Sequence, residues 1–300
     1  MRICLIAFLA IFVSFQVGCG TADRIPVPLV ANDRSEEIDV RQPPLGKQTS
    51  NDVVRLIAWN VESGGNRPAV IAEQLAQFSG YDIVCLSEVD SNNFEVYSKA
   101  LGGKFDPVNG ETGGSDRLQI LVNAERYDLL ESKEMDQYQA YPLNKGSHRS
   151  PLYVRLNDRR SGRELIVMTN HLARGNAEFR QAQAVGLREW ARDQHVGVIA
   201  IGDFNMDYDY LAMKGNEAFI EMVRDNVWSW LPPDDFVDTN WADRDGDGKD
   251  NYPDSMLDLA FAAGPAKEWG IQCRVVVRTD DFPDDDLTSD HRPIELMFEQ

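Results

Sequence analysis

Short apolar runs, each ending in a polar residue, recur along most of the chain and predict β-strands. The runs are rich in Val, Ile and Leu, as is typical of strands buried between layers. Two segments, 68–78 and 177–193, carry apolar residues at helical spacing instead and predict amphipathic helices. The predicted strands are 53–60, 82–89, 117–123, 150–156, 164–172, 196–205, 256–263, 273–277 and 293–298.

This alternation of strands and helices favours an α+β fold in which two sheets pack face to face with helices on the outside. Apolar residues make up 43% of the 300 residues, which is enough to bury a sizeable core. The apolar runs begin after residue 50, and the sequence has no internal repeat of fixed period. We therefore expect one folded domain at 51–300.

The N-terminus has the features of an export signal. Arg2 precedes an apolar run, 3–17, that is too short for a comfortable transmembrane helix. Small residues flank Cys19 as in a bacterial lipoprotein cleavage site, where Cys19 would become the lipidated first residue. We predict a signal peptide at 1–19 and, because four prolines and scattered charges follow, a flexible linker at 20–50. The protein is expected to be exported, either as a cell-envelope lipoprotein or in secreted form.

The net charge of −19, from 49 acidic and 30 basic residues, argues against tight non-specific binding of nucleic acid. Such binding depends on Lys and Arg that neutralise phosphates. The acidic surface serves solubility, or some of its carboxylates hold divalent cations.

Two cysteines lie inside the expected domain. Cys85 falls in an apolar run and is expected as a packed core thiol. A disulfide between Cys85 and Cys273 is an alternative in an exported protein, and the sequence leaves it open.

Several predicted strands end in chemically capable side chains. In the segments WN, SE, NH and GDFN, polar residues directly follow an apolar run. One such residue is unremarkable, but converging Asn, Glu, His and Asp side chains at strand ends would form a site at the rim of a sheet.

These segments carry a resemblance to a known family. WNVES, SEVD, HRSPLYVRL, TNHL, IAIGDFNMD, SMLDLAF and SDHRP occur in the order seen in the endonuclease/exonuclease/phosphatase superfamily, the group of pancreatic deoxyribonuclease. The resemblance runs from Val53 to the C-terminus. It implies a four-layer α/β/β/α sandwich of two mixed sheets, and metal-dependent phosphoester hydrolysis with Mg²⁺ or Mn²⁺.

The resemblance assigns the metal and the attacking water. Glu88 and Asp290 match metal-ligand positions, and Asn60 matches the asparagine that supports the metal and the phosphate. Asp203 matches the aspartate that positions or deprotonates the water. Asn205 matches the asparagine that donates hydrogen bonds to the phosphoryl group.

The resemblance also assigns two histidines and an arginine. His171 would contact the phosphate or protonate the leaving group, with Asp258 orienting it, although the residues before Asp258 depart from the usual motif. His291 would contact the phosphate. Asp116 would orient His291, or is simply a loop carboxylate. Arg149 resembles an arginine that touches the scissile phosphate.

One acidic segment lies outside the family core and has the spacing of a calcium loop. A glycine at the sixth place permits the turn, but the twelfth place holds Asp rather than Glu. We predict a structural Ca²⁺ here, with an acidic loop that binds no ion as the alternative. The predicted ligands are Asp243, Asp245, Asp247, Lys249 and Asp254.

A phosphodiesterase, first of all a nuclease, is the function that the sequence favours. A phosphatase or a sphingomyelinase-like phospholipase, acting on small or lipid substrates, is the alternative, because the family shares one catalytic set across substrates. A catalytically inactive binding module would have no physical need for the full set of site residues. We expect a monomer with a phosphoester substrate, no protein partner, and membrane attachment only through Cys19.

Overall fold

The computed structural model describes residues 53–63, 65–241, 245, 247, 249–253, 255–278 and 288–299. The expected signal peptide with Cys19 and the expected linker lie outside the described residues. Asp243 and Asp254 of the expected calcium loop lie outside them too. Among the helices that are described, none is both long enough and apolar enough to cross a membrane.

The first sheet of the described chain has six strands, and β1 is one of its two central strands. They are β1 (Val53–Asn60), β2 (Ile83–Val89), β3 (Phe105–Asn109), β4 (Arg117–Asn123), β13 (Gln272–Val275) and β14 (Ile294–Glu299). Their order across the sheet is β13-β14-β1-β2-β4-β3. β1 and β2 run parallel, and every other pair of neighbours is antiparallel. The last residues of β1 and β2 therefore reach the same edge of the sheet.

The second sheet also has six strands within the described residues. They are β5 (Tyr127–Glu134), β8 (Leu152–Asp158), β9 (Glu164–His171), β10 (Gly197–Tyr208), β11 (Trp228–Trp230) and β12 (Met256–Ala263). Their order is β11-β12-β10-β9-β8-β5, with β9 and β10 parallel. A small hairpin of β6 (Gln137–Tyr138) and β7 (Tyr141–Pro142) stands apart from both sheets.

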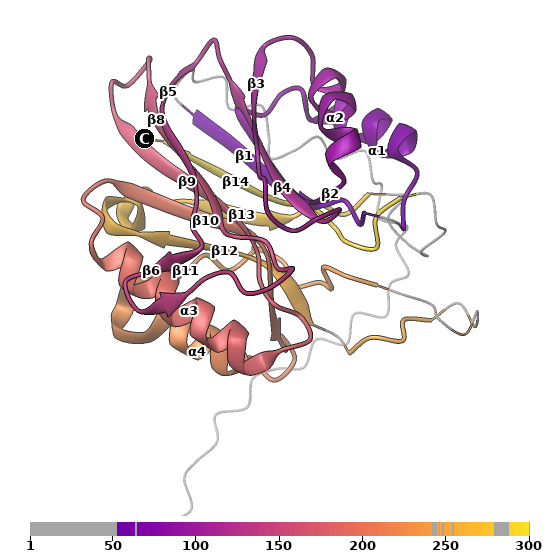
Figure 1. Cartoon of the computed structure of the whole chain (residues 1–300), viewed down its shortest axis with the longest axis vertical. Helices are drawn as coiled ribbons and strands as arrows, with labels where there is room; N and C mark the ends of the chain where they lie inside the picture. Colours follow the sequence, from indigo (N-terminus) through magenta and orange to yellow (C-terminus); the bar gives the residue numbers. More distant parts are fainter. Residues whose placement is uncertain are drawn as a thin grey trace, which may run out of the picture. The chain divides into compact units, whose positions relative to one another are not determined.

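Helices cover the sheets on opposite sides (Figure 1). α1 (Pro68–Leu75), η1 (Ala76–Phe78) and α2 (Phe94–Ala100) bury apolar side chains with Trp59 against the first sheet. α3 (Ala177–Arg192) and α4 (Glu217–Val223) pack beside the second sheet. The 3-10 turns η2 (Ser91–Asn93), η3 (Arg224–Asn226) and η4 (Gly264–Glu268) complete the described helices. The two mixed sheets with outer helices confirm the expected four-layer sandwich.

Local sequence sets where the helices begin. Pro68 stands at the first turn of α1, where a missing backbone N–H costs nothing. The side chain of Asn176 caps α3 by accepting a hydrogen bond from the backbone N–H of Phe179 at 2.9 Å. Asn216 caps α4 in the same way.

Most predicted elements form within one or two residues of their expected bounds, but several weak ones were missed. β5 was missed because most of its residues are exposed, so no apolar run marks it. α2 and α4 were missed because each is only seven residues long. Cys85 and Cys273 are both buried and both free, so the disulfide that the sequence left open does not form.

Candidate active site

Backbone irregularities lie where β2 and β10 reach the rim of the sandwich. The register of β2 against β4 shifts between Leu86 and Val89, and Glu88 sits in this bulge with φ of 55°. The register of β10 against β12 shifts after Asp203, and Asn205 has φ of 50°. Such bulges re-aim side chains, and left-handed backbone at a non-glycine residue is strain that collects at functional sites.

Three residues of the second sheet stand at one level on adjacent strands. Asp203 of β10 is the Cα partner of His171 on β9 and of Asp258 on β12. All three side chains are at least 95% buried. Asp203 therefore lies between His171 and Asp258.

Carboxylates from both sheets meet at Asp203. Ligand atoms of Glu88, His171 and Asp203 all lie within 4.8 Å of one another. The amide nitrogen of Asn60 donates to Glu88 Oε1 at 2.9 Å and to Asp203 Oδ2 at 3.1 Å. Burial raises the pKa of Asp203 to about 7, and Asp258 and Glu88 add to the rise while His291 opposes it. A hard divalent cation fits this group, because it would relieve the repulsion between the carboxylates and accept their oxygens as ligands.

His291 forms the first of two histidine–aspartate pairs. Its Nδ1 lies 2.7 Å from Asp258 Oδ2, and its Nε2 lies 3.7 Å from Asp290 Oδ1. Burial alone would lower the pKa of His291, but Asp258 and Asp290 raise it well above its usual range. His291 therefore carries a proton on each ring nitrogen and a positive charge near neutral pH.

His171 forms the second pair and has the opposite charge state. Its Nδ1 lies 3.3 Å from Asp116 Oδ1, and its Nε2 lies 3.3 Å from Asp203 Oδ2. Burial, with the positive charge of Arg149 adding to it, holds the pKa of His171 well below its usual range. His171 is therefore a neutral imidazole with one ring N–H.

The partners of the two histidines differ from those expected from the sequence. Asp258 contacts His291 rather than His171, and Asp116 lies beside His171 rather than His291. The reason is strand order. β10 separates β9 from β12, so His171 and Asp258 stand two strands apart, about 10 Å. Asp116 is also more than a loop carboxylate, since its Oδ2 accepts a hydrogen bond of 2.7 Å from Arg149.

Two residues expected at the phosphate have donors in the site. Arg149 is 9% exposed, and its Nε makes no hydrogen bond to a described residue. A buried donor without a partner is costly unless a ligand accepts from it. The side-chain amide of Asn205 donates one hydrogen bond to Leu172 O at 3.1 Å, which leaves its second hydrogen for another acceptor.

The expected metal ligands are only partly grouped. Glu88 belongs to the cluster described above, and Asn60 holds that cluster through its nitrogen. The Asn60 oxygen accepts from the backbone N–H of Glu62 at 3.0 Å, so it faces the chain. Asp290 reaches the site through His291, and its own backbone N–H donates to Glu62 Oε2 at 2.9 Å.

Sequence reasoning missed two residues beside the site, Glu62 and Arg174. Glu62 follows WN and joins the β1 end to Asp290. Arg174 comes three residues after His171, and its guanidinium lowers the pKa of that histidine, although less than burial and Arg149 do. The only signal in the sequence was position, since Glu62 follows Asn60 by two residues and Arg174 follows His171 by three.

The acidic segment is described in part. Asp245, Asp247 and Lys249 are exposed, and the Lys249 ammonium lies 3.0 Å from Asp247 Oδ2. The backbone N–H of Lys249 donates to Asp247 Oδ1 at 2.9 Å. Since Asp243 and Asp254 lie outside the described residues, the calcium loop stays a prediction.

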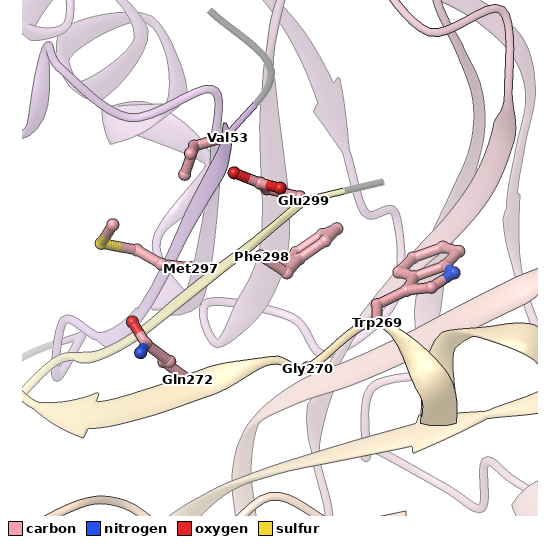
Figure 2. A pocket seen from close by; sticks show the side chains of 7 residues that line it. All are labelled: Val53, Trp269, Gly270, Gln272, Met297, Phe298 and Glu299. Atoms are coloured by element: carbon pink, nitrogen blue, oxygen red, sulfur yellow. The ribbon is translucent and has the colours of Figure 1, made fainter. Parts of the chain in front are cut away.

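A surface hollow lies at the other end of β1 from this site. Figure 2 shows its lining, Val53, Trp269, Gly270, Gln272, Met297, Phe298 and Glu299. Val53 and Asn60 are the first and last residues of β1, roughly 23 Å apart at 3.3 Å per residue. The hollow shares no residue with the carboxylate and histidine site.

A site of this kind at the rim of a four-layer sandwich defines a class of phosphoester-processing proteins. A model of the Endonuclease/Exonuclease/phosphatase family matches residues 57–291, and the chain belongs to this family. Its members are hydrolases that act on phosphoester bonds and generally use a divalent metal. No curated protein matches the chain.

Solved structures with the same fold come from several organisms. A Bacteroides thetaiotaomicron family protein is 17% identical with a TM-score of 0.63, covering 82% of this chain and 94% of that one. A mannosyl-6-phosphatase from Bacteroides thetaiotaomicron VPI-5482 is 16% identical with a TM-score of 0.61, covering 82% and 100%. D. rerio TDP2, complexed with a single-strand DNA product, is 17% identical with a TM-score of 0.64, covering 83% and 100%. At these identities the likeness concerns the fold.

Proposed function

We propose that this protein is a metal-dependent phosphoester hydrolase that cleaves phosphodiesters, with nucleic acid as the first substrate to test. The observation that carries the proposal is the presence of two pairs of a buried histidine with an aspartate, His171 with Asp116 and His291 with Asp258, on the strands that flank Asp203 and at the rim. His291 would be a fixed cation for the phosphate, and neutral His171 can exchange a proton.

The chain's own groups have distinct tasks in this reaction. Glu88 would hold the cation with Asp203 and His171 beside it, and the bound ion would supply positive charge to the phosphoryl oxygens. Asp203, with its pKa near 7, is poised to orient the attacking water and accept its proton. His291 and Arg149 would donate hydrogen bonds to the phosphate, and Asn205 would add one through its second amide hydrogen.

A phosphatase or sphingomyelinase-like phospholipase is the second candidate. Its support is the net charge of −19, which disfavours long-range attraction of a polyanion. The structurally similar mannosyl-6-phosphatase gives this alternative a precedent on the same fold.

A substrate panel with Mg²⁺ or Mn²⁺ distinguishes these candidates. The panel holds duplex DNA, single strands, RNA, sphingomyelin and phosphomonoesters. We expect cleavage of a phosphodiester that excess EDTA abolishes and Mg²⁺ or Mn²⁺ restores. Cleavage of phosphomonoesters or sphingomyelin alone would favour the second candidate. Full turnover in EDTA, with residual metal checked, would contradict metal dependence.

Histidine variants test the site within the same assay. His171→Ala and His291→Ala are each expected to lower kcat roughly 10²–10⁴-fold, because positioned proton transfer and charge stabilisation are lost. His195→Ala is the control, since His195 is exposed in the turn before β10. Equal losses in all three folded variants would mean that the site is misassigned.

We also propose a structural Ca²⁺ in the segment 243–254. Without a cation its carboxylates repel one another, and a cation that binds only the folded state adds its binding free energy to stability. Ca²⁺ should raise the Tm of Glu88→Gln, in which the catalytic cluster has lost a ligand. The double variant Asp245→Ala/Asp247→Ala should lose this rise. If Ca²⁺ raised the Tm of the double variant as much as before, the ion would not bind in this segment.

Export and lipidation of Cys19 complete the proposal. Metabolic labelling with palmitate should mark the wild-type chain and leave Cys19→Ser unlabelled. Release of both proteins into the medium without label would favour the secreted form.

A further inference from the structure

Arg174 is a cation at the rim of the site that makes no ion pair with a described carboxylate. It follows β9 by three residues and is exposed. Among the described residues, no carboxylate lies within the 4.0 Å of a salt bridge to its guanidinium, whereas Arg149 is paired with Asp116 at 2.7 Å. Tyr252 takes one side-chain hydrogen bond of this guanidinium. Because a guanidinium has five N–H donors, others are left for an anionic ligand.

The backbone that carries Arg174 is held by α3. Arg180 Nη1 donates to Ala173 O at 2.7 Å and to Arg174 O at 2.8 Å. The backbone N–H of Ala173 donates to Gln183 Oε1 at 3.0 Å. Arg180 and Gln183 are both less than 10% exposed. These buried side chains therefore fix the backbone at Ala173 and Arg174.

The side chain of Arg174 is held by the acidic segment. Its guanidinium carbon lies 5.1 Å from the ring centroid of Tyr252, within the range of a cation–π contact. Tyr252 is itself attached locally, because its backbone N–H donates to Asp250 Oδ1 at 2.9 Å. This contact restricts the Arg174 side chain before a ligand binds. Less conformational entropy is therefore lost on binding than for a freely rotating side chain.

The charge of Arg174, three residues after His171 in the chain, is coupled to the charges of the site. Partial burial lowers the pKa of Arg174, but Tyr252, Asp203 and Asp290 raise it, and the net pKa lies above its usual value. In turn, Arg174 contributes to the lowered pKa of His171. Its charge therefore acts on His171 and Asp203 of the second sheet and on Asp290 before β14.

We propose that Arg174 binds an anionic oxygen of the substrate, on the scissile phosphate or on the group next to it, and that Tyr252 positions it. Buried Arg149 and exposed Arg174 would then both contact the phosphate. This inference rests on the proposed phosphoester hydrolysis, and it makes Tyr252 a determinant of substrate affinity.

A purely compensating charge is the competing explanation. In that case Arg174 would only offset Asp203 and Asp290, and its removal would strengthen Mg²⁺ binding while leaving phosphate binding alone. A phosphate ligand predicts the opposite pattern.

The test measures binding and turnover separately in the full protein with Mg²⁺. Calorimetry with inorganic phosphate gives Kd, and hydrolysis of bis(p-nitrophenyl) phosphate gives KM and kcat. We expect Arg174→Gln to raise Kd and KM at least tenfold with kcat within threefold of wild type, and Arg174→Lys to recover part of the loss. Tyr252→Leu should raise both constants several-fold, with no further rise when combined with Arg174→Gln.

Arg192→Gln is the matched control, an exposed arginine at the far end of α3, roughly 24 Å along the helix. Unchanged Kd and KM in folded Arg174→Gln, or a change confined to Mg²⁺ affinity, would overturn the inference. Independent, additive losses in the double variant would overturn the positioning role of Tyr252. If wild type hydrolyses no ester, the proposed function fails, but phosphate calorimetry still decides the role of Arg174.

Discussion

At the scale of single residues, the site depends on charge states that neighbours impose. His171 and His291 are the same residue type, both are buried and both have carboxylates nearby. The carboxylates of His291 outweigh the cost of burying its charge, whereas at His171 burial dominates and Arg149 adds to it. Asp203 is the acidic counterpart, since burial and nearby carboxylates favour its neutral form. A residue's chemistry here follows from its contacts rather than from its identity alone.

Asp203 gives a prediction for stability against pH. An unfolded aspartate titrates near pH 3.9, whereas native Asp203 titrates near pH 7. Between these values the native chain binds the extra proton, so the free energy of unfolding of the metal-free protein falls as pH rises from about 4 to about 7. Asp203→Asn cannot ionise and lacks this fall.

The measurement is the Tm in excess EDTA from pH 4 to pH 8.5. The Tm of Asp203→Asn minus that of wild type should rise across the window and stay constant above it. Asp207→Asn, exposed on the same strand, is the control. A difference that does not change with pH would show that Asp203 titrates normally.

At the scale of elements, β10 carries the site because its end departs from regular geometry. Gly202, just before Asp203, has φ of 127°, a conformation that side chains rarely adopt. A Cβ at this position would lie 2.5 Å from Asn170 O on the neighbouring strand. The glycine therefore allows β9 and β10 to stay paired up to the residues of the site.

Gly202→Ala is expected to destabilise the protein by roughly 2–4 kcal/mol and to lower kcat, because strain and the clash displace Asp203. Urea unfolding and turnover at a temperature well below the Tm measure the two effects. Gly103→Ala is the control, since its Cβ would meet nothing within 4 Å. Normal stability and turnover in Gly202→Ala would mean that β10 adapts freely.

At the scale of the whole molecule, a buried arginine ties the two sheets together. Arg126 lies where the chain crosses from β4 to β5 and is 1% exposed. Its guanidinium donates to Val53 O at 2.6 Å and Asp82 Oδ2 at 2.9 Å on the first sheet's side, and to Asp158 Oδ2 at 2.7 Å on the second. Val53 begins β1, so this tie lies at the end of β1 away from the site.

Removing the Arg126 side chain should lower the free energy of unfolding without lowering kcat. Arg126→Leu leaves two buried carboxylates without their cation and is expected to cost about 3–5 kcal/mol in urea unfolding. kcat at low temperature should stay near wild type, because the site lies at the other end. Adding Asp158→Asn should recover part of the loss. Arg155→Leu, which breaks an exposed pair with Glu164, should cost under about 1 kcal/mol. Equal losses of unfolding free energy in Arg126→Leu and Arg155→Leu would contradict a special role of Arg126 in holding the two sheets together.

The sequence by itself determined the strands, the layered fold and the residues at the strand ends. Apolar periodicity and chain-breaking residues act locally, so β1, β4 and β12 could be predicted to the residue. Asn60, Glu88 and His171 stand at or next to the ends of β1, β2 and β9, where the apolar runs stop, so the sequence also predicts that they lie at the rim.

Only the tertiary structure decided which of these residues touch. The partners of His171 and His291 depend on β10 lying between β9 and β12, and strand order is not written in local periodicity. Arg174 meets Tyr252 across 78 residues of chain, through packing that no short motif encodes. Charge states follow the same rule, because burial and the distance to each carboxylate exist only after the two sheets have packed.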